Sequence, residues 1–356
     1  MLVYLAKRIG LMLPTLLLIL LTNFAIIQSA PGGPVEQAIE QAQAEQRGLG
    51  HIAAVDSQVS LQPQYQGARG LSPEMVTEIK QQYGFDQPPV ERFWRMLKSY
   101  ACLDFGTSFF KDQPVIDLIK AKLPVTISLG LWSTLLIYLI SIPLGIKKAR
   151  QHGGRFDQWT AFILVVGHAI PMFIVAILLI VLFAGGSYWH WFPLQGLTSE
   201  NFAQLSVLGK ITDYFRHMAL PLIAMTIGGF AVQTYLVKFS FMEELGKHYV
   251  LTAQAKGLSP RQVLYGHVFK NAVLVLIAGF PEALLGILLT GNLLIEIIFN
   301  LDGMGLLGFE AIVQRDYPVI FATLFIYTLV RLVLRLISDL LYRVVDPRID
   351  FEQRGV

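Results

Sequence analysis

The chain has 356 residues, of which 54% are hydrophobic and only 15% are charged, and its formal net charge is +3. Several apolar runs reach about 18 residues or more, which is enough to cross roughly 30 Å of hydrocarbon. The small net charge and the lack of a long basic block argue against a nucleic-acid partner. A single cysteine, Cys102, excludes an internal disulfide and provides no zinc cluster. The composition predicts an integral membrane protein.

Six apolar segments are predicted to span the membrane, which makes the fold class all-α. Their approximate bounds are residues 9–27, 123–146, 159–184, 219–237, 272–299 and 319–341. The first segment follows Lys7 and Arg8, just as the apolar region of a signal peptide follows basic residues. Its apolar run is longer than that of a signal peptide, and Pro31 would obstruct cleavage, so we expect a retained membrane helix.

Lysine and arginine are concentrated in alternate connecting segments, which predicts the orientation. The segments after the second and fourth spans and the C-terminal tail are basic, whereas those after the third and fifth spans carry few such residues. Because cytoplasmic loops carry the excess of positive charge, both termini are expected in the cytoplasm. The organisation is then an N-terminal helix (1–30), a large external segment (31–122), a core of five spans (123–342) and a cytoplasmic tail (343–356).

The external segment has parts of different composition. Residues 36–70 are rich in Gln, Ala and Gly and are predicted to be weakly ordered. "SPEMVTEIKQQYGF", residues 72–85, predicts a surface helix capped by Ser72. "PPVERFWRMLKSYA" predicts a second, amphipathic helix whose apolar face holds Val90, Phe93, Met96, Leu97 and Tyr100. The segment could form a cap over the membrane domain or a docking surface for an external partner, and both can hold.

A polar, basic stretch, "YVLTAQAKGLSPRQV" at residues 249–263, interrupts the apolar spans. Gly257 can adopt the left-handed conformation that ends a helix running over about residues 243–256. Ser259 with Gln262 forms a capping box, and the next helix continues into the fifth span. A short cytoplasmic helix joined rigidly to a transmembrane helix can pass a push from a partner into the membrane. An ordinary interfacial loop is the alternative.

The extended stretch "YVLTAQAKGLSPRQVLYGHVFKNA" resembles the cytoplasmic EAA loop of ATP-binding-cassette (ABC) importer permeases of the dipeptide and oligopeptide branch. "PGGP", "LDFGTSFF", "LPVTISLGLWSTLLIYLISIPLGIKKAR", "GMGLLGFEAIVQRDYP" and "DPRID" resemble the same branch and occur in family order along nearly the whole chain. The family's Glu-Ala-Ala is replaced by Leu251, Thr252 and Ala253, so its acidic residue is missing, whereas its glycine is matched by Gly257. The long insertion and "VVDPRIDFE" are most similar to permeases for microcin C and oligopeptides.

This resemblance implies a type I ABC importer permease in the bacterial inner membrane that moves peptides or peptide-like compounds into the cytoplasm. Its coupling helix, near residues 243–258, would insert into a cleft of an ATPase. The residues implied in that contact are Tyr249, Thr252, Ala253, Ala255, Lys256, Gly257 and Leu258. Dipeptides, nickel chelates or glycan-peptides are alternative substrates, and a passive channel is an alternative function.

The resemblance also implies the rest of the assembly. The expected partners are a second homologous permease, two ATP-binding domains and a periplasmic solute-binding protein. The chain itself would bind no cofactor or metal, since it has no Walker motif and ATP with Mg²⁺ would belong to the ATPase. The sequence contains no "HExxH" or "GxSxG" motif that would suggest catalysis. The glycines of "GMGLLG" follow no predicted strand, so a bend beside a short helix is expected there rather than a nucleotide site.

Ionisable residues inside the spans are candidates for the translocation pathway, because they are costly in a bilayer unless paired or hydrated. Glu282 is predicted near the midplane of the fifth span, with Gly279 and Pro281 beside it. His168 in the third span is the second candidate, and an interhelical hydrogen bond is its alternative role. In the sixth span Arg335 can pair with Asp339. Close helix contact is expected at Gly228, Gly229, Gly286 and Gly291.

Overall fold

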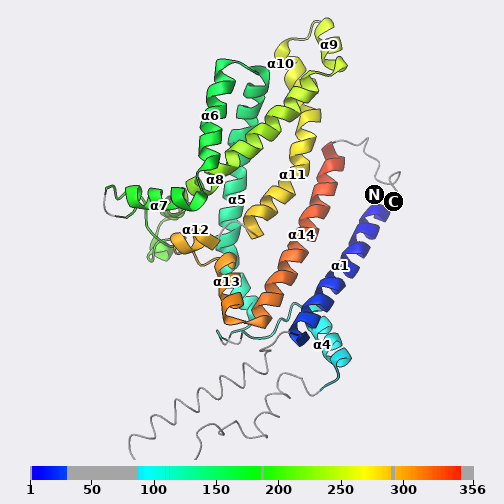
Figure 1. The fold of residues 1–356 in the computed structure, drawn as a ribbon, viewed down its shortest axis with the longest axis vertical. Coiled ribbons are helices and arrows are strands. Elements are labelled where there is room, and N and C mark those ends of the chain that lie inside the picture. The colour runs from blue at the N-terminus through cyan, green and yellow to red at the C-terminus, as the bar shows by residue number, and fades with distance from the viewer. Residues whose placement is uncertain are drawn as a thin grey trace, which may run out of the picture. The chain divides into compact units, whose positions relative to one another are not determined.

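The computed structural model describes residues 2–29, 87–108, 110–111, 113–185, 188–289 and 293–345. These residues are mostly helical, and within them the β structure is one isolated bridge between Thr107 and Pro114. The helices are α1 (Leu2–Ser29), α4 (Pro89–Ala101), α5 (Val115–Arg150), α6 (Arg155–Ala169), α7 (Met172–Phe183), α8 (Val207–Leu245), α9 (His248–Ala255), α10 (Pro260–Val263), α11 (Phe269–Leu289), α12 (Leu293–Ile298), α13 (Met304–Gln314) and α14 (Tyr317–Val345) (Figure 1). The all-α prediction is confirmed. The expectations for residues 36–70, 72–85 and the end of the tail lie outside the described residues.

Within the described ranges, five helical stretches are long and apolar enough to cross a membrane. They are Ala6–Ile26, Val115–Arg150, Val207–Leu245, Pro260–Leu285 and Tyr317–Leu341. Helices α6 and α7 add a sixth crossing if the pair is counted as one broken span. The expectation of about six spans agrees with this count.

The third predicted span is not one helix. Helix α6 ends at Ala169 and α7 begins at Met172, and the two axes differ by 91°. Between them Ile170 is extended, with φ −81° and ψ 122°, and Pro171 precedes α7. A residue before proline is disfavoured in the helical region, which explains the break at this position.

The fifth predicted span is also shorter than its apolar run. Helix α11 ends at Leu289, and the apolar residues that follow include a separate short helix, α12. Ile295 of α12 is fully buried, and Phe299 just after it is buried as well. These side chains are apolar because they fill the protein core, so apolar character alone placed the end of the span too late.

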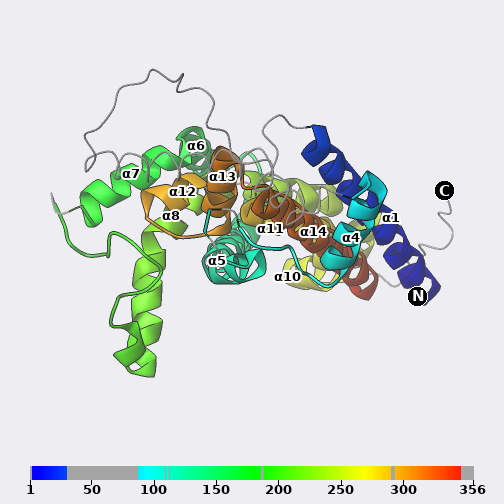
Figure 2. The same ribbon diagram turned by 90° about the horizontal axis from the view of Figure 1, so that it is seen from below.

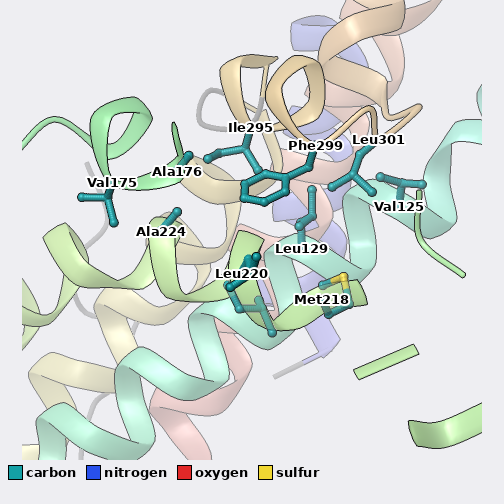
Figure 3. Packing of buried hydrophobic residues seen from close by; sticks show 11 residues of the cluster. Val125, Leu129, Val175, Ala176, Met218, Leu220, Ala224, Ile295, Phe299 and Leu301 are labelled. Atoms are coloured by element: carbon teal, nitrogen blue, oxygen red, sulfur yellow. The ribbon is translucent and has the colours of Figure 1, made fainter. Parts of the chain in front are cut away.

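The chain divides into two compact units. Unit 1 comprises Met1–Ile9, Asp117–Gln314 and Ile326–Val356, and unit 2 comprises Gly10–Ile116 and Arg315–Phe325. One hydrophobic core of unit 1 joins α5, α7, α8 and α12, whose buried side chains point toward one another (Figure 3). Helices α7 and α12 lie side by side although they are far apart in sequence (Figures 1 and 2).

Helices α5 and α8 approach closely because glycines remove side chains from their interface. A β carbon at Gly229 of α8 would lie 2.5 Å from Cδ1 of Ile137 on α5. One at Gly145 of α5 would lie 2.6 Å from Cβ of Val237 on α8. Small residues at such positions are typical of membrane helix interfaces. The expected close contact at Gly229 is confirmed.

Unit 2 is held by aromatic side chains. Tyr100 of α4 meets Phe105 edge-on at 4.9 Å between ring centroids and meets Phe325 at 5.4 Å. In the loop after α4, Ser108 donates a buried hydrogen bond to Asp316. Residues 103–108 of the pattern "LDFGTSFF" therefore belong to a turn that is fixed against the start of α14.

Candidate functional site: the coupling segment

The segment between α8 and α11 forms a helix, a tight turn and a return helix, as predicted. Its first helix is shorter than expected, however, because Glu243 and Glu244 still belong to α8. The chain breaks at Lys247, whose extended backbone (φ −78°, ψ 148°) lets α9 begin at His248. The predicted helix over residues 243–256 is therefore corrected to α9 alone.

Glu244 fixes the angle at this break. Its carboxylate accepts hydrogen bonds from the Lys247 ammonium group and from the Tyr249 hydroxyl, the latter at 2.7 Å. Contact with the carboxylate raises the pKa of Lys247, and burial together with the same carboxylate raises that of Tyr249. The end of a membrane helix is thereby tied to the first turn of α9.

Gly257 ends α9 in the predicted left-handed conformation, with φ +83°. The amide of Gly257 donates to the Gln254 carbonyl at 2.9 Å, and the amide of Leu258 donates to the Ala253 carbonyl at 3.3 Å. This pair of bonds is the Schellman arrangement, which satisfies carbonyls at a helix end. A β carbon at Gly257 would meet no atom within 4 Å, so the glycine is needed for its backbone angle and not for space.

The capping box of the return helix is confirmed. The Ser259 amide donates to Oε1 of Gln262 at 2.9 Å, and the Gln262 amide donates to Oγ of Ser259 at 3.4 Å. Helix α10 then passes through a π turn (Leu264–Val268) directly into α11. An open hollow beside the turn is lined by Ser259, Arg261, Gln262 and Tyr265.

The predicted ATPase-contact residues divide into an outer and an inner set. Thr252, Ala255, Lys256 and Gly257 are exposed, as is Leu251, with 61% of its surface accessible. Ala253 is buried with Val250 in a core shared with α8, α10 and α11. Tyr249 and Leu258 are half-buried against that core. The exposed set forms a surface available to a partner, whereas Ala253 holds α9 in place.

Buried side chains of α9 and α10 share one hydrophobic core with α8 and α11, and these two membrane helices also contact each other near the coupling segment. Phe241 of α8 contacts Phe269 of α11 with ring centroids 5.8 Å apart. Ser240 of α8 donates to the Ala272 carbonyl of α11 at 2.8 Å. Displacement of α9 and α10 would therefore move the adjoining ends of α8 and α11.

A buried charge cluster lies at the ends of α5 and α6 and was not identified from the sequence. Asp157 of α6 binds Lys148 of α5 at 2.9 Å and Lys238 of α8 at 2.7 Å. The Lys148 side chain has no exposed surface, and its ammonium group also donates to the Thr160 hydroxyl at 2.7 Å. In the sequence, Lys148 is one of the basic residues after the second span that indicate the orientation. An acidic residue beside one apolar run and a lysine ending another were the available clues.

The pathway candidates lie on two helices, α6 and α11. His168 of α6 makes a 2.9 Å hydrogen bond through Nδ1 with the Gly228 carbonyl of α8, as its interhelical alternative required. Glu282 belongs to α11, but its side chain lies outside the described part of the chain. On α11, Gly279 has open space beside it and Pro281 is buried.

In the sixth span the expected pair between Arg335 and Asp339 is not formed. The Asp339 carboxylate pairs with Arg8 of α1 at 2.6 Å. Spacing along one helix could indicate a neighbour on that helix, but it could not indicate a partner from another helix.

The glycines of "GMGLLG" accommodate a buried carboxylate. Glu296 of α12 has no exposed surface and accepts a 2.7 Å hydrogen bond from the Leu306 amide in the first turn of α13. A β carbon at Gly303 would lie 2.3 Å from Oε1 of Glu296, and one at Gly305 would lie 3.1 Å from Oε2. The expected short helix is confirmed as α13.

Comparison with known proteins agrees with this arrangement. Residues 141–351 match the family described as binding-protein-dependent transport system inner membrane component. The chain is 52% identical over 364 residues to a peptidoglycan transport system permease protein YejB of Agrobacterium fabrum, covering 99% of both chains. It is 52% identical to the inner membrane ABC transporter permease protein YejB of Escherichia coli O157:H7, again over 99% of both. The dipeptide permease DppB of Lactococcus lactis is 30% identical over 97% of this chain and 98% of its own length.

A solved chain of the MetNI methionine ABC transporter in an inward-facing conformation shares the fold. Its TM-score is 0.50 with 14% sequence identity, over 65% of this chain and 97% of that one.

The chain belongs to the binding-protein-dependent transport system inner membrane components, with a type I ABC importer permease fold. Members of this family are the multi-pass, non-catalytic permease subunits of the inner membrane, and partner ATPases hydrolyse the ATP.

Proposed function

We propose that this chain forms the membrane pathway through which an ATP-driven importer moves peptides or peptide-like compounds of the oligopeptide or microcin C type into the cytoplasm. The observation that carries the proposal is full-length similarity at 52% identity to permeases named YejB. More distant relatives are named as dipeptide and oligopeptide permeases. A shared substrate feature would be a polar peptide backbone.

Peptide-containing fragments of peptidoglycan are a second candidate substrate, because one relative at 52% identity is named as a peptidoglycan transport permease. Transport measurements can separate the two. The complete importer is reconstituted in vesicles with ATP on the ATPase side and binding protein on the other side. Uptake of labelled oligopeptides is then measured in competition with dipeptides, a nickel chelate and peptidoglycan fragments. Competition by peptidoglycan fragments alone would replace the oligopeptide proposal, and equal leakage without ATP would indicate a passive channel.

The proposed coupling site is the exposed surface of α9 and the turn at Gly257. Its support is mechanical: the Glu244 contacts, the Schellman turn and the capping box hold α9 and α10 in a defined position at the ends of α8 and α11. In this proposal an ATPase contacts Thr252, Ala255 and Lys256, and the same ATPase binds ATP with Mg²⁺. The complete assembly has a second homologous permease, two ATPase domains and an external binding protein.

The proposed orientation places both termini and α9 in the cytoplasm and residues 31–122 outside. It is supported by the basic segments after α5 and α8. Single cysteines at Ser57 and Ser259, introduced after Cys102→Ser, can be treated with an impermeant thiol reagent on intact cells. Labelling is expected at position 57 only. Labelling at 259, or at both positions, contradicts this orientation.

A further inference from the structure

Helix α4 leaves part of its apolar surface uncovered. Val90 and Trp94 have 66% and 56% of their surface accessible. They are four residues apart and therefore neighbours on one side of the helix. The next side of the same helix is covered: Phe93 contacts Phe24, and Tyr100 contacts Phe105 and Phe325. The apolar surface of α4 is thus wider than the part that the described residues cover.

The contact between Phe93 and Phe24 sets the level of α4 relative to a membrane span. Phe24 lies two residues before the end of the apolar stretch Ala6–Ile26 of α1, and the two ring centroids are 5.5 Å apart. The end of such a stretch coincides with the border between hydrocarbon and headgroups. Helix α4 is therefore attached to α1 at the depth of the membrane surface.

The charges of α4 suit an anionic surface. The helix contains Glu91, Arg92, Arg95 and Lys98, which gives it two more positive than negative charges. At 100° per residue, Lys98 and Arg95 follow Trp94 around the helix on the side away from Phe93. Both are exposed. Long basic side chains at this position can cover apolar surface with their stems while their charged groups reach the lipid phosphates.

We propose that α4 lies in the membrane surface at the end of α1, with Val90 and Trp94 among the upper acyl chains and with Arg95 and Lys98 on anionic phospholipid headgroups. Tryptophan is enriched at this depth because its ring is amphipathic. Helices with a cationic side and an apolar side bind anionic interfaces in this way. A soluble protein that docked on this exposed strip of Val90 and Trp94 would instead have to bind at headgroup depth beside a membrane span.

The depth of α4 can be measured in the complete importer embedded in lipid nanodiscs. Single cysteines replace Val90, Trp94 or Ser99 in the Cys102→Ser background and carry a nitroxide spin label. Ser99 is the matched control because it lies on the opposite side of the helix from the strip. Labels at 90 and 94 are expected to collide more often with oxygen, which partitions into lipid, than with a water-soluble nickel chelate. The label at 99 is expected to show the lower oxygen-to-nickel ratio. Val90→Cys keeps Trp94, so it tests the depth with the aromatic residue in place.

Equal or greater nickel accessibility at 90 and 94 would overturn the proposal. Labels shielded from both reagents only when the external binding protein is present would assign the strip to that protein instead. The charge component is tested by replacing phosphatidylcholine with phosphatidylglycerol, which should raise the oxygen-to-nickel ratio at position 90. That rise should be lost in Arg95→Gln/Lys98→Gln. Equal ratios in the two lipids would refute the headgroup contact.

Discussion

The hydroxyl group of Tyr249 donates a 2.7 Å hydrogen bond to Oε2 of Glu244, and this bond joins the first turn of α9 to the last turn of α8. Lys247 binds the same carboxylate from the connecting residue. The three residues therefore form a rigid joint between a membrane helix and the proposed ATPase contact.

Tyr249→Phe should loosen this joint, since it removes the donor and keeps the ring. We expect a cost of about 1 kcal/mol and less peptide imported per ATP hydrolysed. The pKa of Lys247 is raised, so its contribution is fully present below its usual value of 10.5 and is lost only as the pH rises through the folded-state value. The joint should thus add no pH dependence near neutrality. The Tyr249→Phe prediction is tested by measuring peptide uptake and ATP hydrolysis in the same vesicles. An unchanged number of peptides imported per ATP would contradict it.

Gly257→Val should disrupt the turn, because a β-branched residue resists a φ of +83°. The expected local cost is on the order of 1–2 kcal/mol, with normal membrane insertion but weak ATPase binding and little uptake. Gly257→Asn is the matched control, since asparagine tolerates the left-handed region and finds free space there. ATPase pull-down and peptide uptake should fall together for valine and stay near normal for asparagine. Full activity of the valine variant would remove α9 as the coupling element.

Asp157→Asn should destabilise the protein strongly, because it leaves Lys148 and Lys238 buried without their carboxylate. Removing one partner of a buried ion pair typically costs about 3–5 kcal/mol. Asp117→Asn is the control: Asp117 pairs with Lys120 on the surface, where such pairs contribute about 0–1 kcal/mol. Thermal unfolding in detergent and the amount of protein in the membrane measure the difference. Equal stability of the two variants would show that the cluster is hydrated.

Gly303→Ala should displace Glu296 from the first turn of α13, since the new β carbon would overlap its carboxylate. A cost of about 1–3 kcal/mol and reduced uptake are expected. Gly308→Ala, inside α13, has free space around its β carbon and should be neutral or slightly stabilising. The thermal unfolding midpoints of the Gly303→Ala and Gly308→Ala variants test this difference. Similar behaviour of the two variants would mean that α12 and α13 adjust to the methyl group.

Glu282→Gln tests the proposed pathway, because a carboxylate predicted near the midplane could contact the substrate amine or a buried cation. The peptide concentration for half-maximal uptake should rise several-fold. Glu310→Gln in α13 is a carboxylate control outside the proposed pathway. Initial uptake rates over a range of peptide concentrations provide the measurement. Unchanged uptake at normal expression would leave Glu282 with a structural role.

The local features of the coupling segment could be predicted from the amino-acid sequence. The turn at Gly257 and the capping box at Ser259 depend on bonds between residues at most five positions apart, so residue type and spacing were sufficient. The number of spans followed similarly from the length of apolar runs. Even so, the start of α9 was missed, since the break at Lys247 depends on its contact with Glu244.

Only the tertiary structure decided which polar side chains are buried and what they bind. From the sequence alone Lys148 is expected to be a surface cation, but α6 and α8 surround it in the fold. Asp339 pairs with Arg8, which lies on a helix more than 300 residues earlier in the chain. Apolar sequence could not distinguish a membrane span from the packed helix α12, because lipid and protein interior select the same side chains. Local hydrogen bonding depends on residues that are close in the sequence, whereas burial and ion pairing depend on which helices the fold brings together.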